Sequence, residues 1–457
     1  MGRVAVAQSP PRAAALFDLS RPITPEVHLI ESGVGYHALV VDGSRFYDLD
    51  SESFRWLAAA VTNGSAATAL AAMHLAQPTP VVDDAPPTQL PVRALSLAVA
   101  QKCNLGCVYC YAREGSFGGK PQNMSKETAR TAVDLLLSQA KPGERINLSF
   151  LGGEPLVNRP VLREATCYAA IEAARRGVRV GFSITSNGTL IDESDADFFE
   201  KYGFAVTISL DGPGATHDRL RPYKGGRGSF ETVLRNIRPL LAHQQRMQVS
   251  ARVTVTPENL GLRETLDYFV DLGFHSVGFS PLLSAPSRRL EMQRSDLSEL
   301  LDAMVDCGEE FERRTVSGQR YPFANLLYAL QEIHKGTHRP YPCGAGAGYF
   351  GVSADGDLSA CHRFVGDAAG AMGSLADGID RTRQTNWLAE RHVHRQEPCR
   401  SCWARYLCGG GCHHEVIHRG RPACDYIRGW LHYCLGAYAR LSWARPDLFG
   451  ADGGRTL

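Results

Sequence analysis

Thirteen cysteines stand in this chain of 457 residues, and they are concentrated in two clusters. The first cluster is Cys103-Asn-Leu-Gly-Cys107-Val-Tyr-Cys110, which follows the apolar run 95–100. Three thiolates on so short a loop can hold three irons of a 4Fe–4S cluster, and the fourth iron then stays open to a small molecule. Zinc binding and burial in a core are the alternatives, but zinc sites usually draw four ligands from two close pairs.

The second cluster lies in the C-terminal third of the chain. Its members follow one another as Cys343, then Gly356 and Cys361, then Cys399-x2-Cys402-x5-Cys408-x3-Cys412, and finally Cys424 and Cys434. The close pair at its centre is also typical of a zinc ribbon, which stays an alternative. The two remaining cysteines, Cys167 and Cys307, fall in predicted helices and are interpreted as buried apolar side chains.

The loop 103–110, with the aromatic Tyr109 before its last cysteine, resembles the radical S-adenosylmethionine (SAM) enzymes. In that family the open iron binds the amino and carboxylate groups of SAM's methionine. An electron from the cluster then cleaves the sulfonium and produces a 5′-deoxyadenosyl radical. The resemblance implies SAM and a 4Fe–4S cluster as cofactors, and an electron donor such as flavodoxin or ferredoxin.

The spacing of the second cluster resembles the SPASM domain, a C-terminal extension with two auxiliary 4Fe–4S clusters in radical SAM enzymes that act on peptides. By this resemblance Cys343, Cys361 and Cys412 hold the first auxiliary cluster, and Cys399, Cys402 and Cys408 hold the second. The fourth ligands stay open. Cys424 and Cys434 are both available to complete the two clusters, or one cluster keeps an open iron.

Residues 92–283 alternate predicted strands and helices. The expected strands are 93–100, 145–151, 178–185, 204–210, 247–255 and 275–281, and the expected helices are 125–139, 160–176, 192–202, 229–243 and 260–272. Six strands joined by helical crossovers predict a parallel sheet. Six units are fewer than the eight of a full barrel, and they agree with the partial (β/α)6 barrel of the radical SAM family. In such folds the carboxyl ends of the strands carry the chemistry.

The second strand after the cysteine loop ends in Gly152-Gly153-Glu154-Pro155, which resembles the family's motif for the methionine amino group of SAM. Two glycines let the backbone approach a ligand closely, and a carboxylate is an acceptor for a cation. A string of this kind alone would be an ordinary turn, but its place after a strand supports the SAM interpretation.

Further polar residues end the next three strands. We expect Ser186 and Asn187 to contact SAM, Ser209 and Asp211 to bind ribose hydroxyls or line the substrate cavity, and Arg252 to pair with the SAM carboxylate. A guanidinium suits a carboxylate through its bidentate geometry. A structural hydrogen bond is an equal alternative for each residue taken singly. His217, Arg221 and Tyr223 follow the fourth strand and are assigned only to the substrate side.

Residues 1–90 are predicted to form a small α+β domain. Short strands are expected at 27–30, 36–41 and 45–49, helices at 51–62 and 65–76, and a proline-rich linker at 78–87. The pattern resembles the peptide-recognition domain of ribosomal-peptide maturation enzymes, whose edge strand would pair with an extended peptide. A structural cap is the alternative. The expected division is therefore 1–90, a radical SAM barrel over 91–310, and a connector with the SPASM domain over 311–457.

Composition excludes several classes of function. The formal net charge is +1, which gives no sign of a nucleic-acid or acidic-membrane partner. The sequence contains no apolar run of membrane-spanning length and no signal-peptide pattern at its start. Clustered cysteines without a secretion signal favour metal binding in the reducing cytoplasm over disulfides.

His362 follows Cys361 at the position where anaerobic sulfatase-maturing enzymes place an aspartate base. A histidine also accepts a proton near neutral pH, so His362 is the expected catalytic base. Segments 402–415 and 424–430 resemble the maturation enzymes of quinohemoprotein amine dehydrogenase, which build thioether links from cysteine sulfur to carbons of acidic residues.

The predicted function is therefore radical modification of a peptide or small protein subunit, with Cys-to-Asp or Cys-to-Glu thioether crosslinks as the product. The auxiliary clusters would take up the released electron. Carbon–carbon crosslinking and sulfatase-type maturation are enzymatic alternatives. A non-catalytic iron–sulfur or zinc scaffold is an alternative of another class, and the intact Gly152-Gly-Glu-Pro155 motif argues against it, because a scaffold has no use for a SAM site.

Overall fold

A computed structural model describes residues 24–77, 79–88, 90–286 and 288–449. Its main sheet contains six parallel neighbours in chain order, β4 (Ala94–Gln101), β6 (Arg145–Gly152), β7 (Arg179–Ser186), β8 (Ala205–Ser209), β9 (Gln248–Val255) and β10 (Ser276–Pro281). All six predicted strands are thus confirmed, with ends that differ by one residue or match. The sheet is open, since β10 and β14 (Gly378–Ile379) lie at its two ends.

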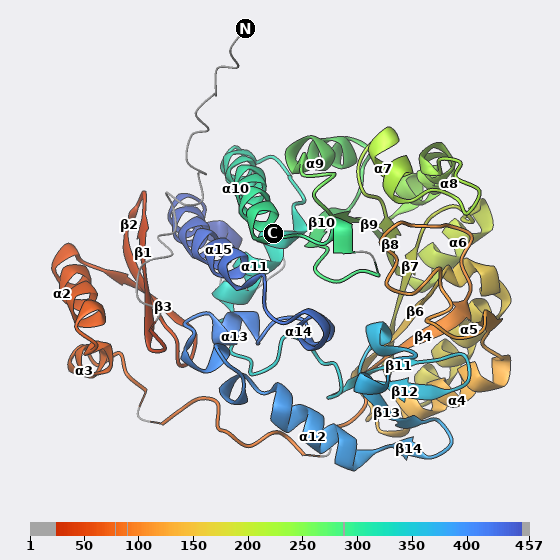
Figure 1. Cartoon of the computed structure of the whole chain (residues 1–457), viewed down its shortest axis with the longest axis horizontal. Helices are drawn as coiled ribbons and strands as arrows, with labels where there is room; N and C mark the ends of the chain where they lie inside the picture. The colour runs from red at the N-terminus through yellow and green to blue at the C-terminus, as the bar shows by residue number, and fades with distance from the viewer. Residues whose placement is uncertain (1–23, 78, 89, 287, 450–457) are drawn as a thin grey trace, which may run out of the picture.

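Helices join these strands and lie in an arc along their outer side (Figure 1). They are α4 (Lys126–Ser138), α5 (Arg159–Arg175), α6 (Glu193–Tyr202), α8 (Phe230–His243) and α9 (Leu262–Asp271), as predicted within two residues, and the short α7 (Ala215–Leu220), which was not predicted. Ser125 begins α4, because its side chain accepts a 3.0 Å hydrogen bond from the Thr128 N–H and so satisfies a free donor of the first turn.

Residue types explain why these segments form strands. In β9 the residues alternate, so that Val249, Ala251, Val253 and Val255 are buried while Arg252 between them is exposed. In β4 every residue after Ala94 is buried, as expected for a central parallel strand covered on both faces. The apolar faces of strands and helices form one continuous core, which leaves the strand ends as the place for polar side chains.

The C-terminal part of the chain extends the same sheet. After α10 (Arg294–Val316) and α11 (Ala324–His334), strand β11 (Tyr349–Val352) pairs in parallel with β4, and β12 (Asp357–Ser359), β13 (Ala371–Ser374) and β14 follow antiparallel. The domain boundary that was expected at residue 310 falls inside α10. Cys343 lies shortly before β11, and Cys361 lies shortly after β12. The pairing of β11 with β4 therefore places both cysteines near the strand that leads into the first cysteine loop.

The N-terminal part forms a separate three-stranded antiparallel sheet, β1 (Val27–Ser32), β2 (Gly35–Val40) and β3 (Arg45–Leu49), followed by α2 (Ser51–Thr62) and α3 (Ala66–Ala72). The predicted strands and helices are confirmed here too. The sheet lies beside the long helix α15 (Cys424–Ala444) in Figure 1, and Ile30 and Leu39 belong to the main core. None of the helices in the described part of the chain is long and apolar enough to cross a membrane.

Candidate functional site

The loop after β4 brings the first three cysteines together. Cys103, Cys107 and Cys110 are free, partly buried thiols. Burial raises the pKa of the Cys107 thiol to about 12, while the nearby Arg221 guanidinium lowers it and the Cys110 and Cys103 thiols raise it further. Such mutual effects are those expected of three neighbouring thiols on one short loop. A bound metal cation stabilises thiolates and overcomes this shift, so the donor set fits an iron–sulfur cluster held by three ligands.

Glu154 lies two residues beyond the end of the neighbouring strand β6 and is completely buried. Its carboxylate accepts hydrogen bonds from the Leu156 N–H at 3.1 Å, the Ser186 hydroxyl at 2.9 Å and the Asn187 N–H at 2.7 Å. Burial raises the pKa of Glu154 to about 7, although these hydrogen bonds lower it. A buried carboxylate whose hydrogen-bond donors in the described part of the chain are all neutral is well suited to receive a cationic ligand group.

Gly152 and Gly153 allow β6 to approach the cysteine loop. Gly152 has a φ of +149°, and a Cβ there would lie 2.2 Å from the Ala100 carbonyl oxygen. At Gly153 a Cβ would lie 2.2 Å from the Lys102 carbonyl oxygen. Contacts this short with backbone atoms exclude any larger residue. Pro155 begins the following short 3-10 helix, Pro155–Asn158. The motif therefore fixes Glu154 next to the segment that leads into Cys103.

Asn187 connects the end of β7 to the same loop. Its side-chain nitrogen donates to the Asn104 side-chain oxygen at 2.9 Å and lies 3.7 Å from the Cys103 sulfur. Ser186 and Asn187 are both buried. The structure therefore places Cys103, Glu154, Ser186 and Asn187 around one position, as expected for a group of ligand contacts at the carboxyl ends of adjacent strands.

Tyr109 lies on the other side of the loop and is held by two charged residues. Its hydroxyl donates to the Asp211 carboxylate and accepts a 2.6 Å hydrogen bond from Arg221. The other Asp211 oxygen accepts the Thr254 N–H at 2.9 Å. Both Asp211 oxygens are thus engaged within the protein, and burial raises the pKa of this carboxyl. Asp211 and Arg221 thus hold Tyr109 in place, and the contact of Asp211 with ribose or the substrate cavity stays a prediction.

Arg252 projects from β9 and donates a 2.5 Å hydrogen bond to the Ser280 hydroxyl of β10. Although the Arg252 side chain reaches solvent, the surrounding protein partly desolvates its guanidinium and lowers its pKa, while Glu415 and Tyr328 raise it. The charge interaction with Glu415 brings Arg252 toward the C-terminal cysteine region. Ser209 lies partly buried at the end of β8, opposite Arg252 in the β8–β9 register.

The middle cysteines form a group of three. Burial raises the pKa of Cys361 to about 12, and the neighbouring thiols of Cys412 and Cys343 raise it further. Arg363 contacts the Cys412 sulfur at 3.8 Å and pairs with Glu415 at 2.7 Å. The Arg363 guanidinium also lies over the Tyr111 ring, 5.3 Å from its centre, which links this group to the residue after Cys110.

The cysteines Cys399, Cys402, Cys408 and Cys424 form a group of four, in which Cys424 takes the place of the fourth ligand that the sequence left open. Burial raises the pKa of Cys399 to about 11, and Cys408, Cys424 and Cys402 all contribute to this rise. These four thiols line one cavity together with Arg421 and Arg428, and Cys412 of the middle group also borders this cavity. Four neighbouring thiols match the full ligand set of a 4Fe–4S cluster or of a structural zinc ion.

Cys434 lies apart from both groups, although it was predicted as a ligand. It stands ten residues beyond Cys424 on the same helix α15 and is 0% exposed. Burial raises its pKa well above the usual value, and within the described residues the charged neighbour that adds to this is Glu312, not a second cysteine. The structure therefore selects Cys424 and places Cys434 in the apolar core.

His362 is bonded to a residue that the sequence did not single out. Its Nδ1 lies 2.8 Å from the Tyr349 hydroxyl, which in turn lies 2.7 Å from the Ser96 hydroxyl of β4. Burial lowers the pKa of His362 to about 4, with a further contribution from Arg363. Tyr349 stands on β11 opposite Ala94 of β4. Only the pairing of β11 with β4 reveals this contact, because 253 residues separate Ser96 from Tyr349.

Known proteins similar to this chain share its fold. Residues 97–269 match the family model described as the Radical SAM superfamily. A serine-type anaerobic sulfatase-maturating enzyme of Klebsiella aerogenes is 27% identical over 356 residues, which cover 75% of this chain and 85% of that enzyme. A cysteine-type anaerobic sulfatase-maturating enzyme of Clostridium novyi (strain NT) is 25% identical over 347 residues, with 70% and 88% covered.

A solved structure described as native anSMEcpe with bound AdoMet superposes with a TM-score of 0.64 and 21% identity, covering 78% of this chain and 99% of that one. At this identity the likeness establishes the α/β fold with its mixed, largely parallel sheet. The finer resemblance to amine dehydrogenase maturation enzymes stays a prediction.

Proposed function

Because the chain is a radical SAM enzyme, we propose that it modifies a peptide or small protein subunit by joining cysteine sulfur to a carbon of an aspartate or glutamate side chain. The observation that carries this proposal is the arrangement of the C-terminal thiols in one group of three and one group of four. When bound, SAM and the 4Fe–4S cluster supply a 5′-deoxyadenosyl radical, which removes a hydrogen atom from a substrate carbon.

The chain's own residues then bind and orient SAM. Cys103, Cys107 and Cys110 hold the radical cluster. The Glu154 carboxylate binds the methionine ammonium, since it is buried with neutral donors and has no cationic partner among its hydrogen bonds. Arg252 pairs with the methionine carboxylate through its guanidinium. Tyr109, held by Asp211 and Arg221, closes the side of the loop that faces the core.

The two C-terminal thiol groups would supply different numbers of ligands to the auxiliary clusters. Cys399, Cys402, Cys408 and Cys424 supply all four ligands of one cluster. Cys343, Cys361 and Cys412 supply three ligands of the other, which leaves one position for an additional thiolate. We assign this position to the substrate cysteine, because Arg363 and Tyr111 connect the middle group directly to the radical loop.

His362 accepts the thiol proton in this proposal. Its lowered pKa keeps the ring neutral at physiological pH, and a neutral ring has a nitrogen free to accept. Nδ1 is engaged by the Tyr349 hydroxyl, which is itself bonded to the Ser96 hydroxyl, so Nε2 is the ring nitrogen that would accept the proton. Sulfur–carbon bond formation removes one hydrogen atom from the carbon, which 5′-deoxyadenosine would retain, and one proton and one electron from the thiol. His362 would take the proton, and an auxiliary cluster would take the electron.

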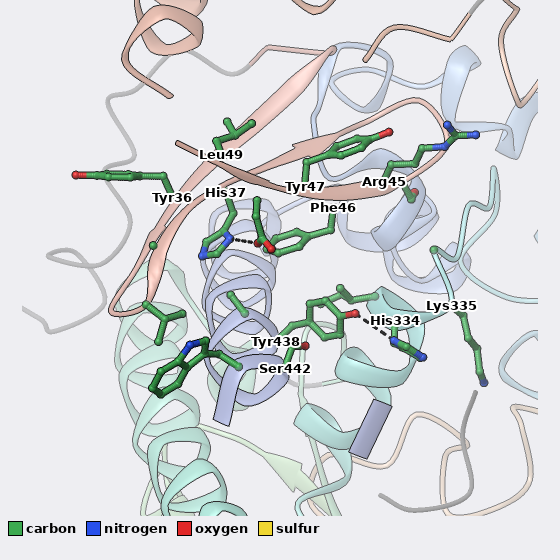
Figure 2. A pocket seen from close by; sticks show the side chains of 18 of the residues that line it. Tyr36, His37, Arg45, Phe46, Tyr47, Leu49, His334, Lys335, Tyr438 and Ser442 are labelled. Carbon is green, nitrogen blue, oxygen red and sulfur yellow. Dashed lines mark hydrogen bonds and ion pairs between the residues drawn. The ribbon is translucent and has the colours of Figure 1, made fainter. Parts of the chain in front are cut away.

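The N-terminal sheet supports peptide docking. Its edge strand β3 borders a cavity of about 950 Å³ shared with α11 and α15. Figure 2 shows Phe46 and His37 reaching from the strands toward Tyr438, with His334 and Lys335 beside it. An extended peptide would add to β3 by backbone hydrogen bonds and place side chains in this cavity. Arg45 and Lys335 are exposed on its border and favour an acidic peptide.

Sulfatase-type maturation is the second candidate, favoured by the similarity to enzymes of that name. The two functions differ in what happens to the reacting cysteine or serine. In the proposed reaction a cysteine of the peptide becomes linked to an acidic residue of the same peptide. Oxidation of a single side chain, by contrast, leaves no crosslink.

The experiment is incubation of the anaerobically reconstituted enzyme with SAM, a reductant and two peptides. One peptide contains cysteine and aspartate or glutamate and comes from a protein encoded beside this one, and the other is a sulfatase peptide. A crosslink in the first peptide, found by fragmentation mass spectrometry, supports the thioether function. Oxidation of the second peptide alone would assign sulfatase maturation instead.

A further inference from the structure

Asp367, His414 and His418 form a cluster of metal-binding side chains that belongs to none of the three cysteine groups. One ligand atom from each residue lies within 4.8 Å of the other two. His418 Nε2 is 2.6 Å from Asp367 Oδ2. His414 Nδ1 is buried without a hydrogen-bond partner in the described part of the chain. An ion pair between His418 and Asp367 would explain two of these side chains but not His414.

Local structure fixes the three side chains. His414 and His418 stand four residues apart on α14 (His413–Arg419), so they share one face of that helix. Asp367 precedes the short 3-10 helix Ala368–Gly370, and its Oδ1 accepts a 2.9 Å hydrogen bond from the Ala369 N–H. This bond orients the carboxylate and directs Oδ2 to His418. Outer hydrogen bonds of this kind are typical of carboxylates that bind metals.

Phe364 covers the cluster on its apolar side. Its ring centre lies 5.0 Å from that of His414 and 6.2 Å from that of His418. The two histidine rings lie 4.6 Å apart. The side chains of Asp367 and His418 stay partly accessible, with exposures of 28% and 37%. A metal ion therefore has an apolar wall on one side and a path from solvent on the other.

We propose that Asp367, His414 and His418 bind one Zn²⁺ ion, with water as the fourth ligand. Two histidines at positions i and i+4 of one helix, together with a carboxylate from a separate loop, are a common zinc ligand set. Ligand atoms at about 2.0–2.1 Å from a tetrahedral zinc ion lie roughly 3.3 Å apart. The ligand atoms of the three side chains lie between 2.6 Å and 4.8 Å apart, a range that includes this value. Small side-chain rotations would therefore assemble the site.

The zinc ion would connect two segments that each follow a thiol of the middle group. Asp367 stands six residues after Cys361, and His414 stands two residues after Cys412. The bound ion would hold the loop and helix α14 at a fixed separation, and thus hold Cys361 and Cys412 in place. The ion would need no change of oxidation state for this, and its water ligand would stay exchangeable.

The test measures zinc on the reconstituted holoenzyme with its iron–sulfur clusters in place. Zinc is added in slight excess, unbound metal is removed by gel filtration, and zinc and iron are counted by mass spectrometry. Zinc-edge X-ray absorption then identifies the ligand atoms. We expect about one zinc per chain with nitrogen and oxygen neighbours at roughly 2.0–2.1 Å and without the sulfur neighbours near 2.3 Å that cysteine ligation gives.

His418→Ala and Asp367→Asn should each lose this zinc while iron content stays at the wild-type level. His418 is partly exposed, so its replacement is compatible with folding, and circular dichroism checks this. His243→Ala, at an exposed position on α8, is the matched control and should keep the zinc. Unchanged zinc in both site variants, sulfur in the zinc shell, or no zinc on the wild type would each overturn the proposal.

Discussion

The Glu154 carboxylate accepts a 2.7 Å hydrogen bond from the backbone N–H of Asn187, which joins the ends of two neighbouring strands, β6 and β7. The side chain of the same asparagine lies 3.7 Å from the Cys103 sulfur. One buried acid is thereby fixed beside the loop that is proposed to hold the radical cluster.

Glu154→Gln should weaken SAM binding roughly 10- to 100-fold, because it removes a charge-assisted hydrogen bond to the ligand's ammonium group. Equilibrium dialysis on reconstituted protein measures the dissociation constant, and iron content should not change. In the wild type, burial raises the pKa of Glu154 to about 7, so affinity should fall as pH drops through 7 and the carboxylate is protonated. Asp197→Asn, exposed on α6, is the control. Equal affinity in the glutamine variant would remove Glu154 from the SAM site.

Gly152→Ala should destabilise the fold by about 1–3 kcal/mol or more, since its φ of +149° strains an L-residue and the added Cβ meets the Ala100 oxygen at 2.2 Å. Thermal unfolding and iron content after gel filtration measure the loss. Gly33→Ala, where a Cβ would have nothing within 4 Å, should leave both unchanged. A stable, iron-replete Gly152→Ala protein would show that β6 does not need this close approach.

Cys424→Ala and Cys434→Ala should behave differently although both residues lie on α15. The first removes a thiol from the group of four and should lower the iron content by about four irons per chain. The second removes a buried side chain from the core and should cost about 1 kcal/mol of stability with iron retained. Iron analysis with Mössbauer spectroscopy separates the two results. Loss of iron in Cys434→Ala alone would reverse the assignment, and zinc in place of iron at this group would indicate a ribbon.

Arg45→Glu combined with Lys335→Glu should weaken binding of an acidic substrate peptide while uncoupled SAM cleavage continues. Both side chains are exposed on the border of the cavity beside β3, so the changes act on charge and not on packing. Fluorescence titration of a labelled peptide measures the affinity. Arg238→Glu, exposed on α8, provides the control. Unchanged peptide affinity in the double variant would leave the N-terminal sheet with the role of a structural cap.

Local patterns in the sequence were sufficient to predict the six parallel strands and their helices, because the spacing of apolar residues differs clearly between strands and helices. The sequence was also sufficient to predict that Cys103, Cys107 and Cys110 form one group, because all three lie within eight residues of chain. The choice between Cys424 and Cys434 needed the structure, because their positions on one helix decide which faces the other thiols.

Contacts between distant segments were the part that sequence reasoning missed. Tyr349 approaches His362 and Ser96 only because β11 pairs with β4. Arg221 was assigned to the substrate side, yet it contacts Tyr109 through a 2.6 Å hydrogen bond. Asp367 meets His418 across 51 residues of chain. No spacing rule predicts such pairs, since packing of whole elements creates them.

The measurement that tests the central claim most directly follows a deuterium atom from the peptide to the product of SAM. The substrate peptide carries deuterium on the side-chain carbons of its aspartates and glutamates and is incubated with reconstituted enzyme, SAM and a reductant. We predict deuterium in 5′-deoxyadenosine, a peptide that has lost one deuterium and one hydrogen per crosslink, and a cysteine that no longer reacts with alkylating reagent. The Cys103→Ala/Cys107→Ala/Cys110→Ala variant should show none of these changes. Turnover of SAM without deuterium transfer, or modified peptide whose cysteines still react with alkylating reagent, would contradict the account.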